Sequence, residues 1–236
     1  MNSKLAMFIA FLFILSGCTN TNLNISDYQK KEKIVLGTNA QIEPFSYYEN
    51  GNITGIDINI AQKVADRLGV SLEIKDMNFE SLQTNLANHK IDFIISAVSK
   101  NNDDTIQLGL SDTYYNSEQV VIILKNGDIN SIKDLKDKTV GIPKGRFDIE
   151  EAKRLTSAEI EEYNTGVSAL IDLKDKKLDA VIFDKKSAEI WQNQNPDIKI
   201  LDKIKDEEYV AVVREGEQEL KKVINEVIKE FKLTQQ

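Results

Sequence analysis

The residues most suited to catalysis are few in this chain. His89 is the only histidine and Cys18 the only cysteine, so an internal disulfide is excluded. His89 lies between Asn88 and Lys90, where a helix is expected to turn into a strand, and is most simply a surface residue. The sequence contains no nucleophile motif, metal cluster or phosphate-binding loop. We therefore expect no enzyme activity, no cofactor and no metal.

Small residues that could bind a ligand follow a buried strand. The run from Ile91 to Ile95 is mostly apolar, and Ser96, Ala97 and Ser99 come just after it. Strands alternate with helices along the chain, which favours a parallel sheet with helices on its faces. Ligands of such sheets bind beyond the carboxyl ends of the strands, so these three residues are expected to line a site.

The cation best placed to bind an anion is Arg146. It follows Gly145 at a predicted strand-to-helix turn, where free backbone N–H groups and the helix dipole favour anions. A solvated loop arginine is the alternative interpretation. Lys144 and Lys100 are weaker candidates because their stems are flexible.

The stretch from Val35 to Val70 predicts the elements that would position such a site. A short β-rich run is followed by Asn50 and Gly51, a strong hairpin signal. Apolar residues then repeat at helical spacing, with Asp57 expected as the N-cap and Gly69 as the left-handed C-cap. Strand, loop, hairpin and capped helix therefore occur within one short stretch.

This order resembles the N-terminal block of the type II periplasmic solute-binding proteins of amino-acid ABC transporters, the bacterial extracellular solute-binding protein family 3. The residues that match the family pattern are Gly37, Thr38, Asn39, Pro44, Phe45, Gly51, Gly55, Asp57, Leu68, Gly69 and Val70. Residues 110–115 resemble the family's F-S-D-P-Y-Y run, and residues 178–184 match its G-x-x-D-A-x-x-x-D block. The resemblance extends from Ile34 to about Phe231, with all blocks in order.

The resemblance implies an α/β fold with two lobes, each a mostly parallel sheet flanked by helices, joined by two crossover strands. Residues 34–120 and 209–236 would form lobe 1, and residues 121–208 would form lobe 2. A small polar ligand, an amino acid or a related compound, would bind between the closing lobes and be passed to an ABC transporter permease. The alternatives on this fold are a cyclohexadienyl dehydratase-like enzyme and a ligand-sensing binding protein.

The resemblance also implies which residues bind the ligand. In the family an aromatic residue stacks on the ligand's side chain, and an acid in lobe 2 takes its α-ammonium group. Asp184 matches that acid, although it could equally be the N-cap of a helix from Lys185 to Trp191. Phe79 matches an aromatic of the pocket, whereas Asn39 and Ile42 hold positions that are often acidic and usually aromatic, respectively.

The arginine with which the family clamps the α-carboxylate is replaced here by Asp104. A carboxylate at that position reverses the charge, so the usual clamp cannot operate. Two outcomes remain open. Either Arg146 restores carboxylate binding from lobe 2, or the protein prefers a cationic ligand without an α-carboxylate, such as an amine.

The N-terminal sequence predicts export and lipid anchoring. Residues 1–17 have the form of a signal peptide, with Lys4 ahead of an apolar run that is too short to span a bilayer. Small residues precede Cys18, which is expected to be lipidated, and residues 18–33 are expected to be a flexible tether. We therefore expect a monomer anchored to the bacterial cell membrane, on the periplasmic side or the cell surface. The net charge of −8 is spread over mixed surfaces, so no nucleic-acid partner is expected.

Overall fold

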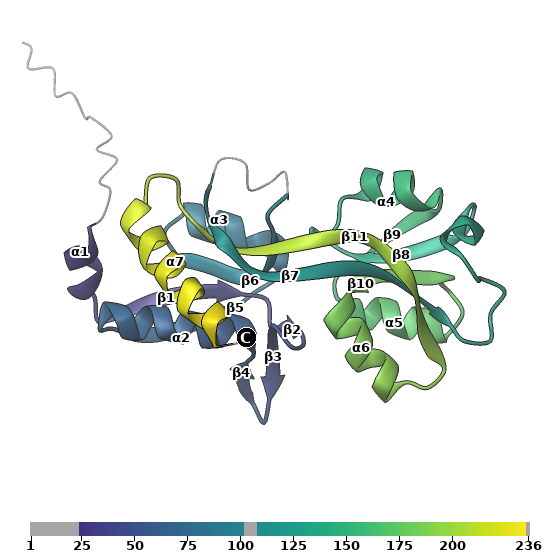
Figure 1. The fold of residues 1–236 in the computed structure, drawn as a ribbon, viewed down its shortest axis with the longest axis horizontal. Coiled ribbons are helices and arrows are strands. Elements are labelled where there is room, and N and C mark those ends of the chain that lie inside the picture. Colours follow the sequence, from purple (N-terminus) through teal and green to yellow (C-terminus); the bar gives the residue numbers. More distant parts are fainter. Residues whose placement is uncertain (1–23, 102–107, 235–236) are drawn as a thin grey trace, which may run out of the picture.

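Two lobes share one long sheet in the computed structural model, which describes residues 24–101 and 108–234 (Figure 1). The sheet has eight strands in the order β5-β1-β6-β11-β7-β10-β8-β9. Lobe 1 contains β1 (Lys33–Thr38), β5 (Ser71–Asp76) and β6 (Phe93–Ser99), and lobe 2 contains β8 (Thr139–Pro143), β9 (Glu159–Tyr163) and β10 (Ala180–Asp184). Within each lobe these strands pair in parallel. The predicted fold class is confirmed.

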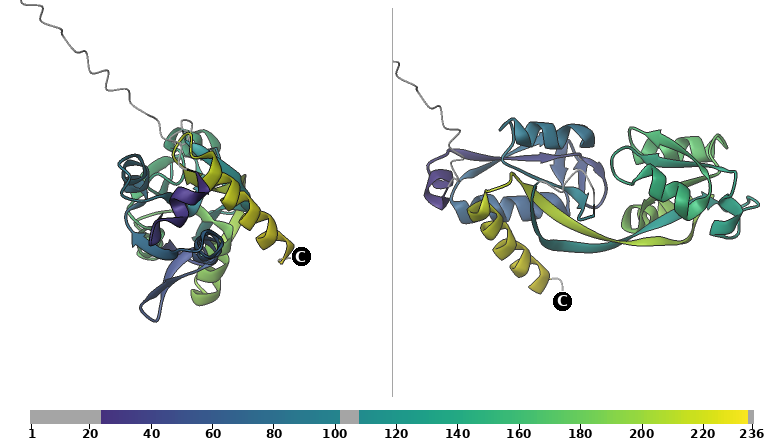
Figure 2. Two further views of the ribbon diagram at one scale, coloured as in Figure 1. Left: turned by 90° about the vertical axis from the view of Figure 1, so that its left-hand side faces the viewer. Right: turned by 90° about the horizontal axis from the view of Figure 1, so that it is seen from above.

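Two strands, β7 (Gly109–Leu124) and β11 (Ile198–Val213), run through both lobes and pair with each other in antiparallel fashion (Figure 2). In lobe 1, β11 pairs with β6, and in lobe 2, β7 pairs with β10. The sequence predicts strands only at their apolar ends, Val120 to Leu124 and Glu208 to Val213. The polar middle parts are also strands because each supplies the other with backbone hydrogen bonds between the lobes. The predicted lobe boundaries, 120/121 and 208/209, fall within these two strands.

Helices cover both faces of the lobe 1 sheet. The helices α2 (Ile56–Leu68) and α7 (Gln218–Leu233) contribute to one apolar core, and α3 (Leu82–Ala87) packs on a second core with Ile91 and Ile94. The apolar residues of α2 and α7 recur every three or four positions, so each helix buries one face. A separate three-stranded sheet of β2 (Gln41–Ile42), β3 (Ser46–Glu49) and β4 (Asn52–Thr54) lies beside them. The short helix η1 (Phe79–Ser81) precedes α3.

Lobe 2 has the same layered arrangement. The helix α4 (Ile149–Thr156) and the short helix η3 (Ile132–Leu135) pack on one core, whereas α5 (Gly166–Lys174) and α6 (Lys185–Gln194) pack on another. Phe183 and Trp191 stack there with ring centroids 4.4 Å apart. Both faces of each lobe's sheet are thus buried, as expected for parallel strands.

The start of α2 differs from the prediction. Gly55 is the N-cap, and Asp57 lies within the first turn with its side chain fully buried. The prediction that Asp57 caps the helix is therefore wrong. The predicted C-cap is confirmed, because Gly69 adopts the left-handed conformation with a φ of 72°.

The segment before β1 also differs from the prediction. Residues 18–33 were expected to form a tether, but Ile25–Gln29 form the helix α1, which is capped by Asn24. Tyr28 is only 1% exposed and joins the lobe 1 core. The tether prediction is wrong for this part of the segment, since burying the tyrosine fixes the helix on the lobe. Residues 1–17 and Cys18 lie outside the described residues, as does Asp104.

Candidate functional site

The side chain of Arg146 extends from lobe 2 to lobe 1. The residue follows β8, and its guanidinium group donates one hydrogen bond to the main-chain oxygen of Ser96 and one to Oδ1 of Asn39, both at 3.0 Å. Its Cζ atom lies 4.3 Å from the centroid of the Phe79 ring. Burial lowers the pKa of Arg146, but an arginine remains protonated in a protein. A positive charge is therefore held at the centre of the interlobe region.

Lobe 1 presents the contacts of Arg146 at one edge of its sheet. The parallel pairing of β1 with β6 ends at Gly37 and Ile94, which brings Asn39, just after β1, next to Ser96, which lies within β6. The main-chain N–H of Asn39 donates to Oγ of Ser96 at 3.0 Å, and its side-chain amide donates to the carbonyl of Met77 at 3.1 Å. The second of these bonds turns Oδ1 of Asn39 towards Arg146. Asn39 is thus oriented by its neighbours before any ligand contact.

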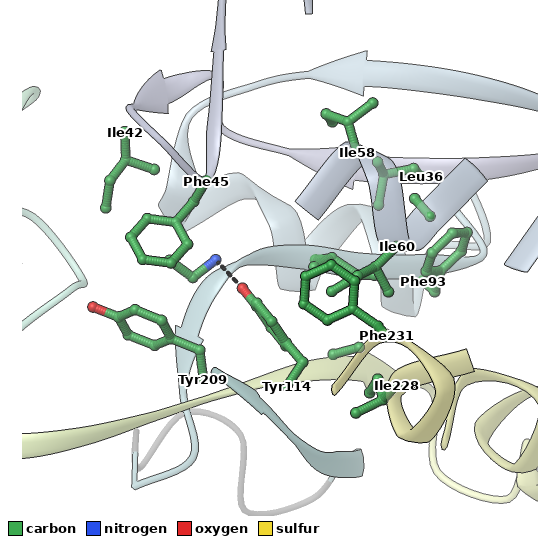
Figure 3. Close-up of a cluster of buried hydrophobic side chains, with 14 of the residues drawn as sticks. Leu36, Ile42, Phe45, Ile58, Ile60, Phe93, Tyr114, Tyr209, Ile228 and Phe231 are labelled. Atoms are coloured by element: carbon green, nitrogen blue, oxygen red, sulfur yellow. Dashed lines mark hydrogen bonds between the residues drawn. The ribbon is translucent and has the colours of Figure 1, made fainter. Parts of the chain in front are cut away.

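Asp57 fixes the main chain beside Ser96. Its carboxylate accepts hydrogen bonds from the Tyr114 hydroxyl at 2.7 Å and from the main-chain N–H of Ala97 at 3.1 Å. The same N–H of Ala97 also donates a hydrogen bond to the hydroxyl of Tyr114. Figure 3 shows the Tyr114 side chain within the apolar core of lobe 1. Ala97 has a φ of 45°, a conformation that non-glycine residues seldom adopt. Complete burial raises the pKa of Asp57 to about 6.

Asp184 caps the helix α6, so its predicted capping role is confirmed. One carboxylate oxygen accepts from the main-chain N–H groups of Lys186 and Ser187, at 2.8 and 3.1 Å. The other accepts from the hydroxyls of Ser117 and Tyr209, at 2.5 and 2.8 Å. These four donors match the number of lone pairs on a carboxylate, so a ligand ammonium group would have to displace a hydroxyl. Burial raises the pKa of Asp184.

A small cavity of about 10 Å³ lies between Arg146 and Asp184, with Ile42 and Ala97 in its wall. A volume of this size holds about one water molecule. A cavity of about 240 Å³ on one side includes Ser99, and one of about 280 Å³ includes Phe79. The two lobes therefore contact each other through the Arg146 side chain, and the larger cavities remain beside it.

The structure brings the predicted site residues together. The small cavity is lined by four of them, Ile42, Ala97, Arg146 and Asp184. Asn39 and Ser96 accept hydrogen bonds from Arg146, and the Phe79 ring stacks on its guanidinium group. Ser99 lines the 240 Å³ cavity together with Arg146. Ser99 also donates a hydrogen bond of 2.5 Å to the buried carboxylate of Glu207. Lys100, a weaker candidate cation, is instead paired with Glu208 on the surface.

Several residues of the site were missed by sequence analysis. Tyr209 lies on the crossover strand β11 and packs edge-on against Phe45, with the ring centroids 5.2 Å apart (Figure 3). Its hydroxyl donates a hydrogen bond to Asp184. Gln119 and Phe147 line the small cavity. The sequence signal for Tyr209 is weak, because polar residues precede it and its strand was identified only from its apolar end.

A cleft between two α/β lobes joined by two crossover strands, with polar groups converging from both sides, defines a type II periplasmic binding protein. The chain belongs to a family within this class, the bacterial extracellular solute-binding proteins, family 3, whose pattern it matches over residues 34–236. The family predicted from the sequence is confirmed. Proteins of this family act outside the cytoplasm, and every helix in residues 24–101 and 108–234 is too short or too polar to cross a membrane.

Comparisons with individual proteins agree with this assignment. The chain is 31% identical over 225 residues to the arginine-binding extracellular protein ArtP of Bacillus subtilis, covering 93% of this chain and 88% of ArtP. The structure of holo ArgBP from T. maritima is similar, with a TM-score of 0.82, 31% identity, and coverage of 88% of this chain and 93% of that one. An ancestral arginine-binding protein bound to glutamine has a TM-score of 0.79 and 32% identity, covering 86% and 93%.

Proposed function

We propose that this protein is the substrate-binding component of an ABC importer and that it captures a small amino acid-like ligand through the ligand's carboxylate. Membership of the solute-binding family supports the transport role, and the similar proteins are described as amino-acid-binding proteins. Arg146 is the carboxylate-binding group, and Asp184 contacts the ligand's ammonium group in addition to capping α6. The protein binds its ligand without converting it.

The direction of the Arg146 side chain carries this proposal. Its guanidinium group reaches lobe 1 instead of pointing away into solvent, and the residue is partly buried. Two of its five N–H groups donate to lobe 1, within the part of the chain that the structure describes, which leaves donors for a carboxylate. This direction favours the first of the two outcomes left open by the sequence, in which Arg146 replaces the family's clamp.

Calorimetry with a matched pair of ligands tests this role. A thermal-shift screen of amino acids, amines and small acids first selects a ligand, since a ligand at 100 times its Kd should add about 2.7 kcal/mol of stability. The chosen amino acid and its decarboxylated amine are then titrated into the parent and Arg146→Ala. We expect the amino acid, but not the amine, to lose affinity about tenfold or more in the variant.

The matched control is Arg154→Ala, which removes an exposed arginine of the same lobe that pairs with Glu151. This control should bind both ligands as the parent does. If the amino acid binds Arg146→Ala and the parent with equal affinity, Arg146 does not bind the carboxylate. Consumption of a prephenate-like acid by the parent would instead favour a dehydratase on this fold.

The mature protein is proposed to be a monomer held at the outer face of the bacterial cell membrane by lipid on Cys18. There it would deliver its ligand to the permease. The signal-like sequence before Cys18 supports lipidation. Lipid labelling and membrane fractionation of Cys18→Ala test the anchor, and unchanged labelling of the variant would refute it.

A further inference from the structure

A set of groups suited to a guanidinium cation lies on lobe 1. The face of the Phe79 ring, Oδ1 of Asn39 and the main-chain oxygen of Ser96 surround the guanidinium group of Arg146. An aromatic face attracts a cation, and two neutral oxygens accept its N–H groups without a charge of their own. These three groups, which we call the guanidinium subsite, all belong to lobe 1, whereas the cation belongs to lobe 2.

The electrostatic surroundings also favour a cation at this point. The buried carboxyls of Asp57 and Asp184 oppose the lowering of the pKa of Arg146 that burial causes. These groups remain in place when the arginine is removed, because other residues hold them. Asp57 is bonded to Ala97 and Tyr114, and Asp184 to the start of α6. The subsite would therefore keep its preference for a cation without Arg146.

The main chain fixes the position from which Arg146 reaches the subsite. Gly145 has a φ of 69°, and the N–H of Arg146 donates to the carbonyl of Pro143 at 3.3 Å, which forms a tight turn. A group tethered in this way acts at an effective concentration of at least the order of millimolar. A free guanidinium compound must compete with it for the same three contacts.

We propose that Arg146 is an internal competitor that fills the guanidinium subsite and so excludes ligands with a guanidinium side chain. This inference rests on the proposed function of the cleft and specifies its ligand class as amino acids with neutral or acidic side chains. Exclusion of guanidinium side chains would distinguish this chain from the similar proteins that are described as arginine-binding. Arg146 is then both the group that binds the carboxylate and the group that determines side-chain specificity.

The test uses methylguanidinium, which carries no carboxylate, and L-arginine as probes in calorimetry. We expect Arg146→Ala to bind methylguanidinium about tenfold or more tightly than the parent does, since the cation then meets the aromatic face and both acceptors. L-arginine should bind the variant and not the parent at the same concentrations. Arg154→Ala should behave as the parent, and adding Phe79→Leu to Arg146→Ala should remove the gain.

A second variant, Arg146→Met, retains an apolar stem and is measured in parallel. If a variant is destabilised, methylguanidinium should raise its melting temperature by more than it raises that of the parent. That result would also support the subsite. The proposal is overturned if neither variant gains affinity or stability from methylguanidinium, or if the parent binds L-arginine as tightly as Arg146→Ala. Methylguanidinium has no carboxylate, so this result is independent of whether Arg146 binds the ligand's carboxylate.

Discussion

The carboxyl of Asp57 should make the stability of this protein fall as the pH rises through the weakly acidic range. Burial raises its pKa from 3.8 to about 6 in the folded chain. The folded state then binds this proton more tightly than the unfolded state, so stability decreases as the pH rises from about 4 to about 6 and is constant with respect to this group at higher pH. A difference of about two pKa units corresponds to about 3 kcal/mol.

Urea denaturation of the parent and of Asp57→Asn between about pH 4 and pH 7 measures this effect. Asparagine does not titrate, so the free energy of unfolding of the variant relative to the parent should rise by about 3 kcal/mol across the window. Comparing the two proteins cancels the titration of the other carboxyls. A difference that stays constant within a few tenths of a kcal/mol over this range would show that the pKa of Asp57 is not raised.

The hydroxyl of Tyr114 provides a second check on the same group. Its hydrogen bond to Asp57 lowers the carboxyl's pKa and so opposes the effect of burial. Tyr114→Phe should therefore move the titration window to higher pH. Tyr115→Phe is the matched control, because the neighbouring hydroxyl is not among the groups bonded to Asp57. An unchanged window in Tyr114→Phe would mean that the hydrogen bond does not act on the charged form.

Three further predictions concern Asp184, Gly55 and Ser187. Asp184→Asn keeps an oxygen for the cap of α6, so the melting temperature of the variant should stay near that of the parent. Calorimetry should show that a ligand with an ammonium group binds the variant about 2 kcal/mol more weakly. Equal affinity for the two proteins would restrict Asp184 to capping. Gly55→Ala should lower the free energy of unfolding by about 1–3 kcal/mol or more, because its φ is 124° and a Cβ would lie 2.1 Å from the carbonyl oxygen of Phe45. Gly51→Ala, with a φ of 80° and no atom within 4 Å of a Cβ, should cost less in the same urea titration, and equal costs would exclude the clash as the cause. Ser187→Ala removes a hydrogen bond from lobe 2 to the lobe 1 main chain, so the closed form should be destabilised by about 0.5–1.5 kcal/mol relative to the open form. The variant should then bind its ligand more weakly, with the stability of each lobe unchanged. Unchanged affinity would mean that the bond does not favour closure.

Local sequence patterns predict most of the fold because each element buries one apolar face. The helical repeat of α2 and the buried run of β6 are visible in the sequence, and so is the C-cap at Gly69. Asp57 was assigned as an N-cap because the residue type suits a helix start, but its partners, Ala97 and Tyr114, are 40 and 57 residues away along the chain. A long-range partner of this kind leaves no local signal.

The site was predicted in part for a similar reason. The residue types at strand ends identified Ser96, and the resemblance to the family identified Asn39 and Phe79. Neither source could show that Arg146 reaches all three of them, because the direction of a side chain in a turn depends on tertiary packing. The polar middle of β11, which leads to Tyr209, also has no apolar alternation that would predict a strand.

Closure of the cleft depends differently on the two lobes. Arg146 and Ser187, both on lobe 2, donate hydrogen bonds to main-chain oxygens of lobe 1, at Ser96 and Glu43. Any residue at these two lobe 1 positions offers the same main-chain oxygen, whereas replacing either donor removes a bond between the lobes. Substitutions of the side chains at Ser96 and Glu43 therefore leave these two bonds in place, whereas substitutions of Arg146 or Ser187 remove them. Arg146 also bonds to a side chain of lobe 1, that of Asn39, so a substitution at either of these two residues also changes the closure of the cleft.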